Sequence, residues 1–192
     1  MTFFALAATF APWLVLKFLM LVPLFPPLTM LKISITVATA IAVYQTRQGV
    51  HRGLMAWGTL LFFAFCLVTV VLMTNMWVIH HLGVLANGKL TLMTWLSMLV
   101  KRPFTLAYAR EKVDPQYWYH PQFLRVNYII TGAWAVAFSF NLLNSVAALY
   151  GIDMTWWEHE LIDNGATLAA IWITMHYSKP RPAVQAPPAT NG

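Results

Sequence analysis

Long apolar runs constrain the fold of this chain more than any other feature. The stretch LMAWGTLLFFAFCLVTVVLM, residues 54–73, carries no charged residue over 20 positions. About 20 apolar residues is the length that an α-helix needs to cross a bilayer. Only 9% of the 192 residues are charged, whereas a soluble domain carries about a quarter. So few charges cannot cover a water-exposed surface, and the sequence predicts an all-α, polytopic transmembrane helix bundle.

The apolar runs divide the chain into six predicted membrane spans, separated by prolines, glycines and charged stretches. The spans are expected at residues 3–22, 28–44, 54–73, 88–100, 126–150 and 161–177. Residues 75–90 are only moderately apolar, and part of this stretch is expected to lie in the membrane interface. Residues 1–177 therefore form one transmembrane domain, and the Pro-rich segment 178–192 is predicted to be a disordered cytoplasmic tail.

The basic residues predict the orientation of these spans. Lys and Arg are enriched in the short cytoplasmic loops of membrane proteins. Nine of the twelve basic residues fall in alternate connections, residues 45–53, 101–125 and 178–192, whereas Lys89 falls in an opposite connection. The chain is therefore predicted to cross its membrane six times with both termini in the cytoplasm. Because membrane orientation explains the basic residues, no nucleic-acid partner is expected.

The connection at residues 101–125 combines five basic residues with a cluster of aromatic ones. An amphipathic segment lying in the cytoplasmic interface is the simplest interpretation. A docking surface for another membrane protein subunit, or for an anionic lipid, is the alternative. The residues expected to make these contacts are Lys101, Arg102, Pro103, Phe104, Tyr108, Arg110 and Trp118.

Charged side chains within spans are costly in a bilayer and are usually paired or functional. Lys17 lies in the first predicted span, and Asp163 opens the sixth at a similar outer depth. We therefore predict a Lys17–Asp163 pair, with Lys32 as a competing cation. In the alternative, Lys17 extends to the outer interface without a partner.

Polar residues recur along one arc of the fifth predicted span. Asn127, Thr131, Asn141 and Ser145 share this arc at about 100° per residue. Such a stripe normally faces other helices and makes interhelical hydrogen bonds. The second interpretation is a polar path between helices, which would belong to a small-molecule or ion transporter.

Two histidine-containing stretches fall on the predicted outer side of the membrane. His80, His81, Glu158 and His159 could supply nitrogen and oxygen ligands to a divalent metal, and histidines on facing helices could hold a haem. Their spacing matches no zinc motif, and the chain has neither a nucleophile elbow nor a P-loop. No cofactor and no catalytic residue are therefore predicted, and a metal- or haem-dependent redox protein stands as a further alternative.

The stretches LVKRPFTLAYAREKV and RVNYIITGAWAVAFSFNLLN resemble the second half of the intracellular septation protein A family. The resemblance covers roughly residues 85–177. Its matching positions are Lys101 or Arg102, Pro103, Asn127, Ala133 and Trp134. It implies a small polytopic protein of the bacterial inner membrane with a role in cell-envelope organisation. With the composition, it leads us to expect a non-catalytic scaffold or accessory subunit of a membrane complex.

Overall fold

A computed structural model gives the fold of the chain and describes residues 10–20, 24–47, 54–110, 113–152 and 155–178. Every regular element in these ranges is helical, which confirms the predicted all-α class. The elements are α2 (Ala11–Met20), α3 (Pro27–Arg47), α4 (Leu54–Cys66), the π-helix η1 (Leu67–Leu72), α5 (Met76–His80), α6 (Leu82–Leu99), α7 (Thr105–Arg110), the 3₁₀-helix η2 (Pro115–Tyr117), α8 (Pro121–Leu149) and α9 (Trp156–Tyr177).

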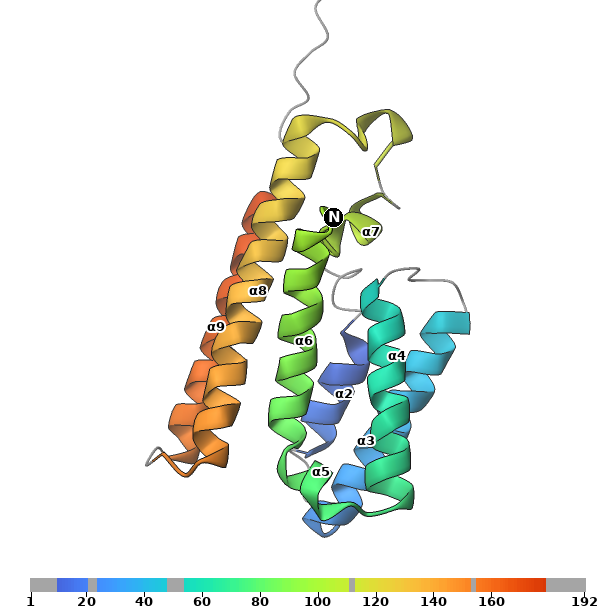
Figure 1. The fold of residues 1–192 in the computed structure, drawn as a ribbon, viewed down its shortest axis with the longest axis vertical. Coiled ribbons are helices and arrows are strands. Elements are labelled where there is room, and N and C mark those ends of the chain that lie inside the picture. Colours follow the sequence, from blue (N-terminus) through green and yellow to red (C-terminus); the bar gives the residue numbers. More distant parts are fainter. Residues whose placement is uncertain (1–9, 21–23, 48–53, 111–112, 153–154, 179–192) are drawn as a thin grey trace, which may run out of the picture.

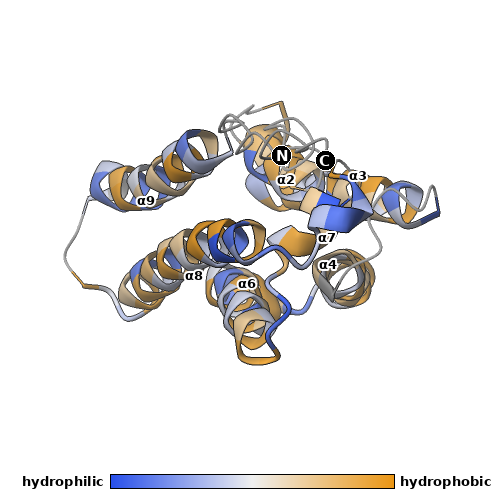
Figure 2. Ribbon diagram, turned by 90° about the horizontal axis from the view of Figure 1, so that it is seen from above, coloured by the Kyte–Doolittle hydropathy of each residue, from blue (hydrophilic) through white to orange (hydrophobic). Residues whose placement is uncertain are grey.

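The longer helices run along one common direction and form two layers. Seen from above, α9, α2 and α3 lie in one layer, and α8, α6 and α4 lie in the other (Figure 2). Helix α8 packs against both α6 and α9, and α2 packs against α3 (Figure 1). The short helix α7 lies near the end of the bundle where α6 ends and α8 begins. The layers enclose an interior to which all six long helices contribute.

Two groups of buried apolar side chains fill this interior. The first gathers around Tyr108, Trp134 and Phe138 and joins α4, α6, α7, α8 and α9. The second gathers around Ile35 and Phe63 and joins α3, α4, η1 and α5. Trp13 of α2 packs against both groups. Helix α2 therefore links the two halves of the core.

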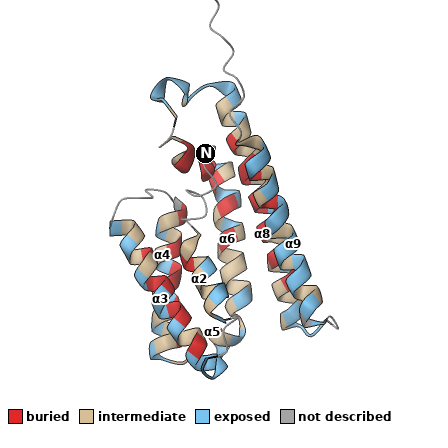
Figure 3. Ribbon diagram, turned by 180° about the vertical axis from the view of Figure 1, so that it is seen from behind, coloured by how far each residue is buried: buried red, intermediate tan, exposed pale blue. Residues whose placement is uncertain are grey.

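Within the described residues, three helical segments are long and apolar enough to cross a membrane: Pro27–Arg47, Met55–Leu72 and Pro121–Leu149. They correspond to the second, third and fifth predicted spans. Only 33–44% of the residues in their apolar stretches are buried within the protein, and Figure 3 shows exposed residues along the outer faces of the helices. Apolar side chains that face outward along the whole length of a helix suit contact with lipid.

Helix α6 corrects the start of the fourth predicted span. It begins at Leu82, six residues earlier than predicted, so residues 82–90 belong to the same continuous helix as the predicted span. A Cβ on Gly83 would lie 3.4 Å from Ser145 Oγ, and Asn87 Nδ2 donates to the same hydroxyl at 2.8 Å. The small and polar residues that weaken the apolar signal therefore face α8.

Helix α9 begins at Trp156, ahead of the predicted start at residue 161. Thr155 and Glu158 form a capping box, in which the Thr155 backbone N–H and hydroxyl both donate to Glu158 Oε2, at 2.6 and 2.8 Å. These two hydrogen bonds hold the pKa of the Glu158 carboxyl below its ordinary value. The cap satisfies backbone donors that the first turn of a helix otherwise leaves free.

The middle of the connection between α6 and α8, residues 103–109, is folded into the bundle, which corrects the predicted interfacial segment. Pro103, Phe104 and Tyr108 are buried, so they offer no docking surface. Ser97 Oγ accepts a hydrogen bond from the Phe104 backbone N–H at 3.2 Å, and the hydroxyl of Thr105 donates to the Asn127 carbonyl of α8 at 3.1 Å. The amphipathic pattern correctly indicated an apolar face, but this face packs against the protein core and does not contact lipid.

The burial of α7 predicts unequal costs for two phenylalanine substitutions. Phe104→Ala should lower the free energy of unfolding by about 3 kcal/mol, because it leaves a cavity in the core. Phe140→Ala is the matched control, since Phe140 is 55% exposed on α8, and it should cost about 0.5 kcal/mol. Thermal unfolding of both variants in one detergent would measure the difference. Equal losses would contradict a buried α7.

Candidate functional site

The predicted polar stripe of α8 contacts three neighbouring helices. Asn127, Thr131 and Asn141 are buried and Ser145 is half-buried. Thr131 bonds to a hydroxyl of α7, Asn141 to a hydroxyl of α9, and Ser145 to an amide of α6, at 2.9, 3.4 and 2.8 Å. Asn127 Nδ2 donates to a carbonyl one turn earlier in α8. All of these partners lie on α8 itself or on helices next to it, as expected for hydrogen bonds that support helix packing.

Asn144 extends the stripe and was not predicted. Its Nδ2 donates to Asp163 Oδ1 at 2.8 Å and to the His159 carbonyl at 2.9 Å, and its Oδ1 lies 2.6 Å from His159 Nδ1. Asn144 is three residues after Asn141 and therefore on the same helix face. This spacing was the signal that could have identified it.

Lys17 forms an ion pair with an acidic residue of α9, but the acid is Glu160 and not the predicted Asp163. Its Nζ lies 3.3 Å from Glu160 Oε2 and donates to Asn164 Oδ1 at 2.9 Å, whereas the Asp163 carboxylate accepts from Asn144 of α8. The predicted Lys17–Asp163 pair is therefore wrong. Glu160 and Asn164 are four residues apart and share the face of α9 toward α2, while Asp163 points toward α8.

Lys32 does not compete for this acidic site. Its Nζ donates to Thr74 Oγ1 at 2.6 Å, in the connection between η1 and α5. Thr74 adopts a positive φ of 50°, which is uncommon for a residue other than glycine. The Lys32 contact therefore joins the start of α3 to a tightly turned connection.

The hydrogen bonds of His81, Glu158 and His159, three residues of the predicted metal site, go to separate partners. His81 Nδ1 lies 2.7 Å from the Trp77 carbonyl, His159 bonds to Asn144, and Glu158 caps α9. His80 packs edge-on against His81. Within the described ranges, no group of three or more His, Cys, Asp or Glu side chains could hold a metal ion. The predicted ligands are not brought together there.

The basic side chains around α7 differ in exposure, and that of Arg110 is half-buried. Lys101 and Arg102 are exposed, and Lys101 has a positive φ of 56° at the turn after α6. The guanidinium of Arg110 lies 5.4 Å from the Trp118 ring centroid and 5.7 Å from that of Tyr119. Stacking of this kind fixes an arginine while leaving part of its charge open to other ligands. The predicted anionic-lipid contact of this region stays a prediction.

Lys89 is a second residue that the sequence analysis did not single out. It was expected in an outer connection, but it lies in the middle of α6 with its side chain toward α2 and α4. Its Nζ donates to Thr59 Oγ1 at 3.0 Å and stands 5.1 Å from the Trp13 ring centroid. No carboxylate among the described residues lies within ion-pair distance of this Nζ. A cation in an apolar bundle without a counter-ion marks a candidate functional site.

The packing around Lys89 depends on a glycine. A Cβ on Gly58 of α4 would collide with Met93 Sδ and would lie 3.2 Å from Lys89 Cε. Thr59 follows Gly58 and receives a second hydrogen bond, from Trp13 Nε1 at 3.4 Å. The Gly-Thr pair therefore supplies both the space and the acceptor for the lysine.

The chain matches no family model, no curated protein and no solved structure. The arguments about its function therefore rest on its own residues and their geometry.

The contacts of Asn144 predict that truncating this one side chain destabilises the protein. Asn144→Ala removes the partners of Asp163 and His159, and should lower the free energy of unfolding by about 1–3 kcal/mol. Asn164→Ala is the control, because Asn164 is exposed and should cost under about 1 kcal/mol. Intrinsic tryptophan fluorescence during thermal unfolding would report both. If Asn144→Ala costs no more than its control, the α8–α9 bonds are not stabilising.

Proposed function

We propose that the chain is a multi-pass protein of a bacterial inner membrane, with six membrane segments and both ends on the cytoplasmic side. Exposed aromatic side chains near both ends of the bundle support this proposal. Tyr44 and Trp57 lie where α3 ends and α4 begins, and Trp77 and Tyr150 lie near the opposite end (Figure 1). Aromatic residues gather at the two interfaces of membrane proteins.

The charges support the orientation of the bundle. Arg47, Lys101, Arg102 and Arg125 lie at the end where α3 and α6 finish and α8 begins. Glu160 lies near the opposite end, within the first turns of α9. Since basic residues favour the cytoplasmic side, the end that carries the arginines is assigned to the cytoplasm.

Within this membrane the protein is proposed to act as a non-catalytic scaffold or accessory subunit of a cell-envelope complex. One observation carries the proposal: polar groups inside the bundle bond mainly to one another, while large apolar side chains of the same helices point outward. Leu61, Leu143 and Trp172 are 67%, 65% and 63% exposed. Such surfaces can bind other membrane helices as well as lipid.

A native mass spectrum of the intact protein, gently solubilised from its own membrane, tests the scaffold proposal. We expect additional polypeptides in a fixed ratio to this chain. If the outer face of α9 binds these polypeptides, Trp172→Ala should reduce the ratio. Phe104→Ala is the control, because it destabilises the fold without changing that face. A lone chain, or only multiples of it, would contradict the scaffold proposal.

Lys89 favours a second candidate, a transporter of anions or small anionic solutes. An ammonium group between α2, α4 and α6 could attract an anion into the interior. The polar side chains on α6 and α8, Asn87 and Ser145 among them, would then belong to the path. This candidate differs from the scaffold in requiring the charge of Lys89.

Lys89→Met separates the two candidates, because methionine keeps much of the side-chain length and removes the charge. If Lys89 has no role in transport, the Lys89→Met variant should be at least as stable as the parent. Replacing a buried charge by an apolar group is often neutral or stabilising. Anion flux into proteoliposomes would be measured in parallel, with Lys17→Met as the control. Flux lost only in Lys89→Met would favour the transporter, and flux absent from the parent would exclude it.

A further inference from the structure

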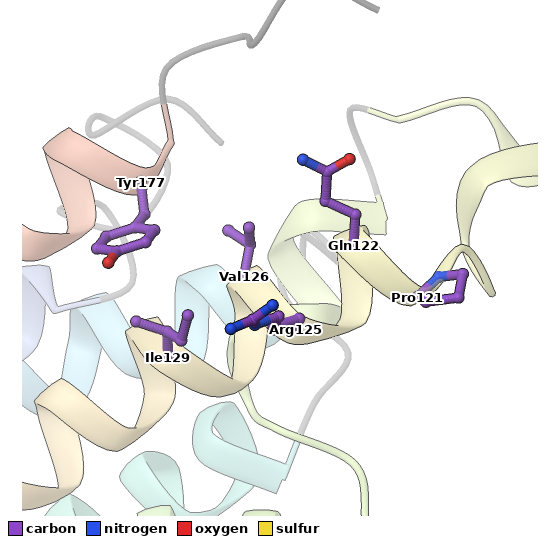
Figure 4. A pocket seen from close by; sticks show the side chains of 6 residues that line it. All are labelled: Pro121, Gln122, Arg125, Val126, Ile129 and Tyr177. Carbon is purple, nitrogen blue, oxygen red and sulfur yellow. The ribbon is translucent and has the colours of Figure 1, made fainter. Parts of the chain in front are cut away.

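A groove opens between the start of α8 and the end of α9. Its volume is about 520 Å³, and it is lined by Pro121, Gln122, Arg125, Val126, Ile129 and Tyr177 (Figure 4). This volume lies within the range of sites that bind small ligands. The groove sits at the basic end of the bundle.

The groove combines a polar part and an apolar part. Gln122, Arg125, Val126 and Ile129 share one face of α8, because they are spaced three or four residues apart. Figure 4 shows Tyr177 of α9 opposite this face. The guanidinium of Arg125 and the amide of Gln122 supply hydrogen-bond donors, and Val126 and Ile129 supply an apolar wall. A ligand that fits both parts has an anionic group next to an apolar chain.

The charge of Arg125 is not used by the fold. Arg125 is exposed, and it forms no ion pair and no hydrogen bond with another side chain in the described part of the protein. It precedes the predicted fifth span, which starts at Val126, so its guanidinium stands at the level of lipid headgroups. Arginine binds phosphate through two parallel N–H donors.

We propose that this groove binds one anionic phospholipid. The headgroup phosphate accepts hydrogen bonds from Arg125 and Gln122, and one acyl chain lies against Val126 and Ile129. Basic pockets between helices on the cytoplasmic side of a membrane are suited to such headgroups. This inference rests on the proposed membrane location, and it adds that the protein binds an anionic lipid of that membrane.

Two other occupants fit the charge of the groove less well. The tail that follows Tyr177, residues 178–192, carries Lys179 and Arg181 and no acidic side chain, so it would bring like charges to Arg125. A second copy of the chain would bring the same basic end. Neither occupant neutralises the guanidinium, whereas a phospholipid phosphate does.

Native mass spectrometry of the purified full chain tests the proposal, with phosphatidylglycerol and phosphatidylcholine of the same acyl chains added in turn. We expect one bound phosphatidylglycerol to be retained in preference to phosphatidylcholine. Arg125→Gln should reduce this retention about tenfold, as expected for the loss of hydrogen bonds to a charged group. Arg47→Gln is the matched control, because Arg47 is exposed at the same end but lies outside the groove, and it should bind like the parent.

Several results would overturn the lipid site. Equal retention by Arg125→Gln and the parent, with equal melting temperatures, would show that the guanidinium does not hold the lipid. Displacement by millimolar inorganic phosphate or glycerol 3-phosphate would assign the groove to a soluble phosphate ester, and a lipid-free dimer would assign it to a second copy. Carbonate extraction of native membranes tests the location separately: a chain that stays in the membrane but fails the lipid test loses only this inference.

Discussion

Hydrogen bonds between helices hold this bundle in one arrangement, and α8 makes most of them. In a bilayer, apolar side chains gain little by leaving lipid for a neighbouring helix, so polar contacts and close packing decide which helices associate. The buried face of α8 bonds to α6 through Ser145, to α7 through Thr131 and to α9 through Asn144. The position of each of these three helices therefore depends on side chains of a single helix.

The spans that could be predicted are those whose helices are long and mostly apolar. α3, the segment Met55–Leu72 and α8 are of this kind, so hydropathy alone identifies them. The start of α6 could not be predicted in this way, because Gly83 and Asn87 lower the apolar signal while facing α8. The burial of α7 was also hidden, since an amphipathic pattern does not say whether lipid or protein covers its apolar face.

The polar contacts show a second limit of sequence reasoning. A cation on α2 and an acid on α9 were placed at a common depth, and depth follows from position along a helix. Which acid faces the cation depends on rotation about the helix axis, and neighbouring residues differ by about 100°. Glu160 faces Lys17 for this reason, and Asp163 does not. Lys89 was missed because the predicted span began only one residue before it, and it was therefore counted with the outer connection.

The contact between Lys17 and Asn164 joins residues 147 positions apart, and so connects the first described helix to the last. A chain made from its N-terminus onward has no α9 when α2 leaves the ribosome. The contact between these two helices therefore cannot form until α9 has been made. Until then, the interior of the bundle, which includes Lys89, is not covered by α9. A nascent chain that stops before residue 164 cannot form the contact between Lys17 and Asn164.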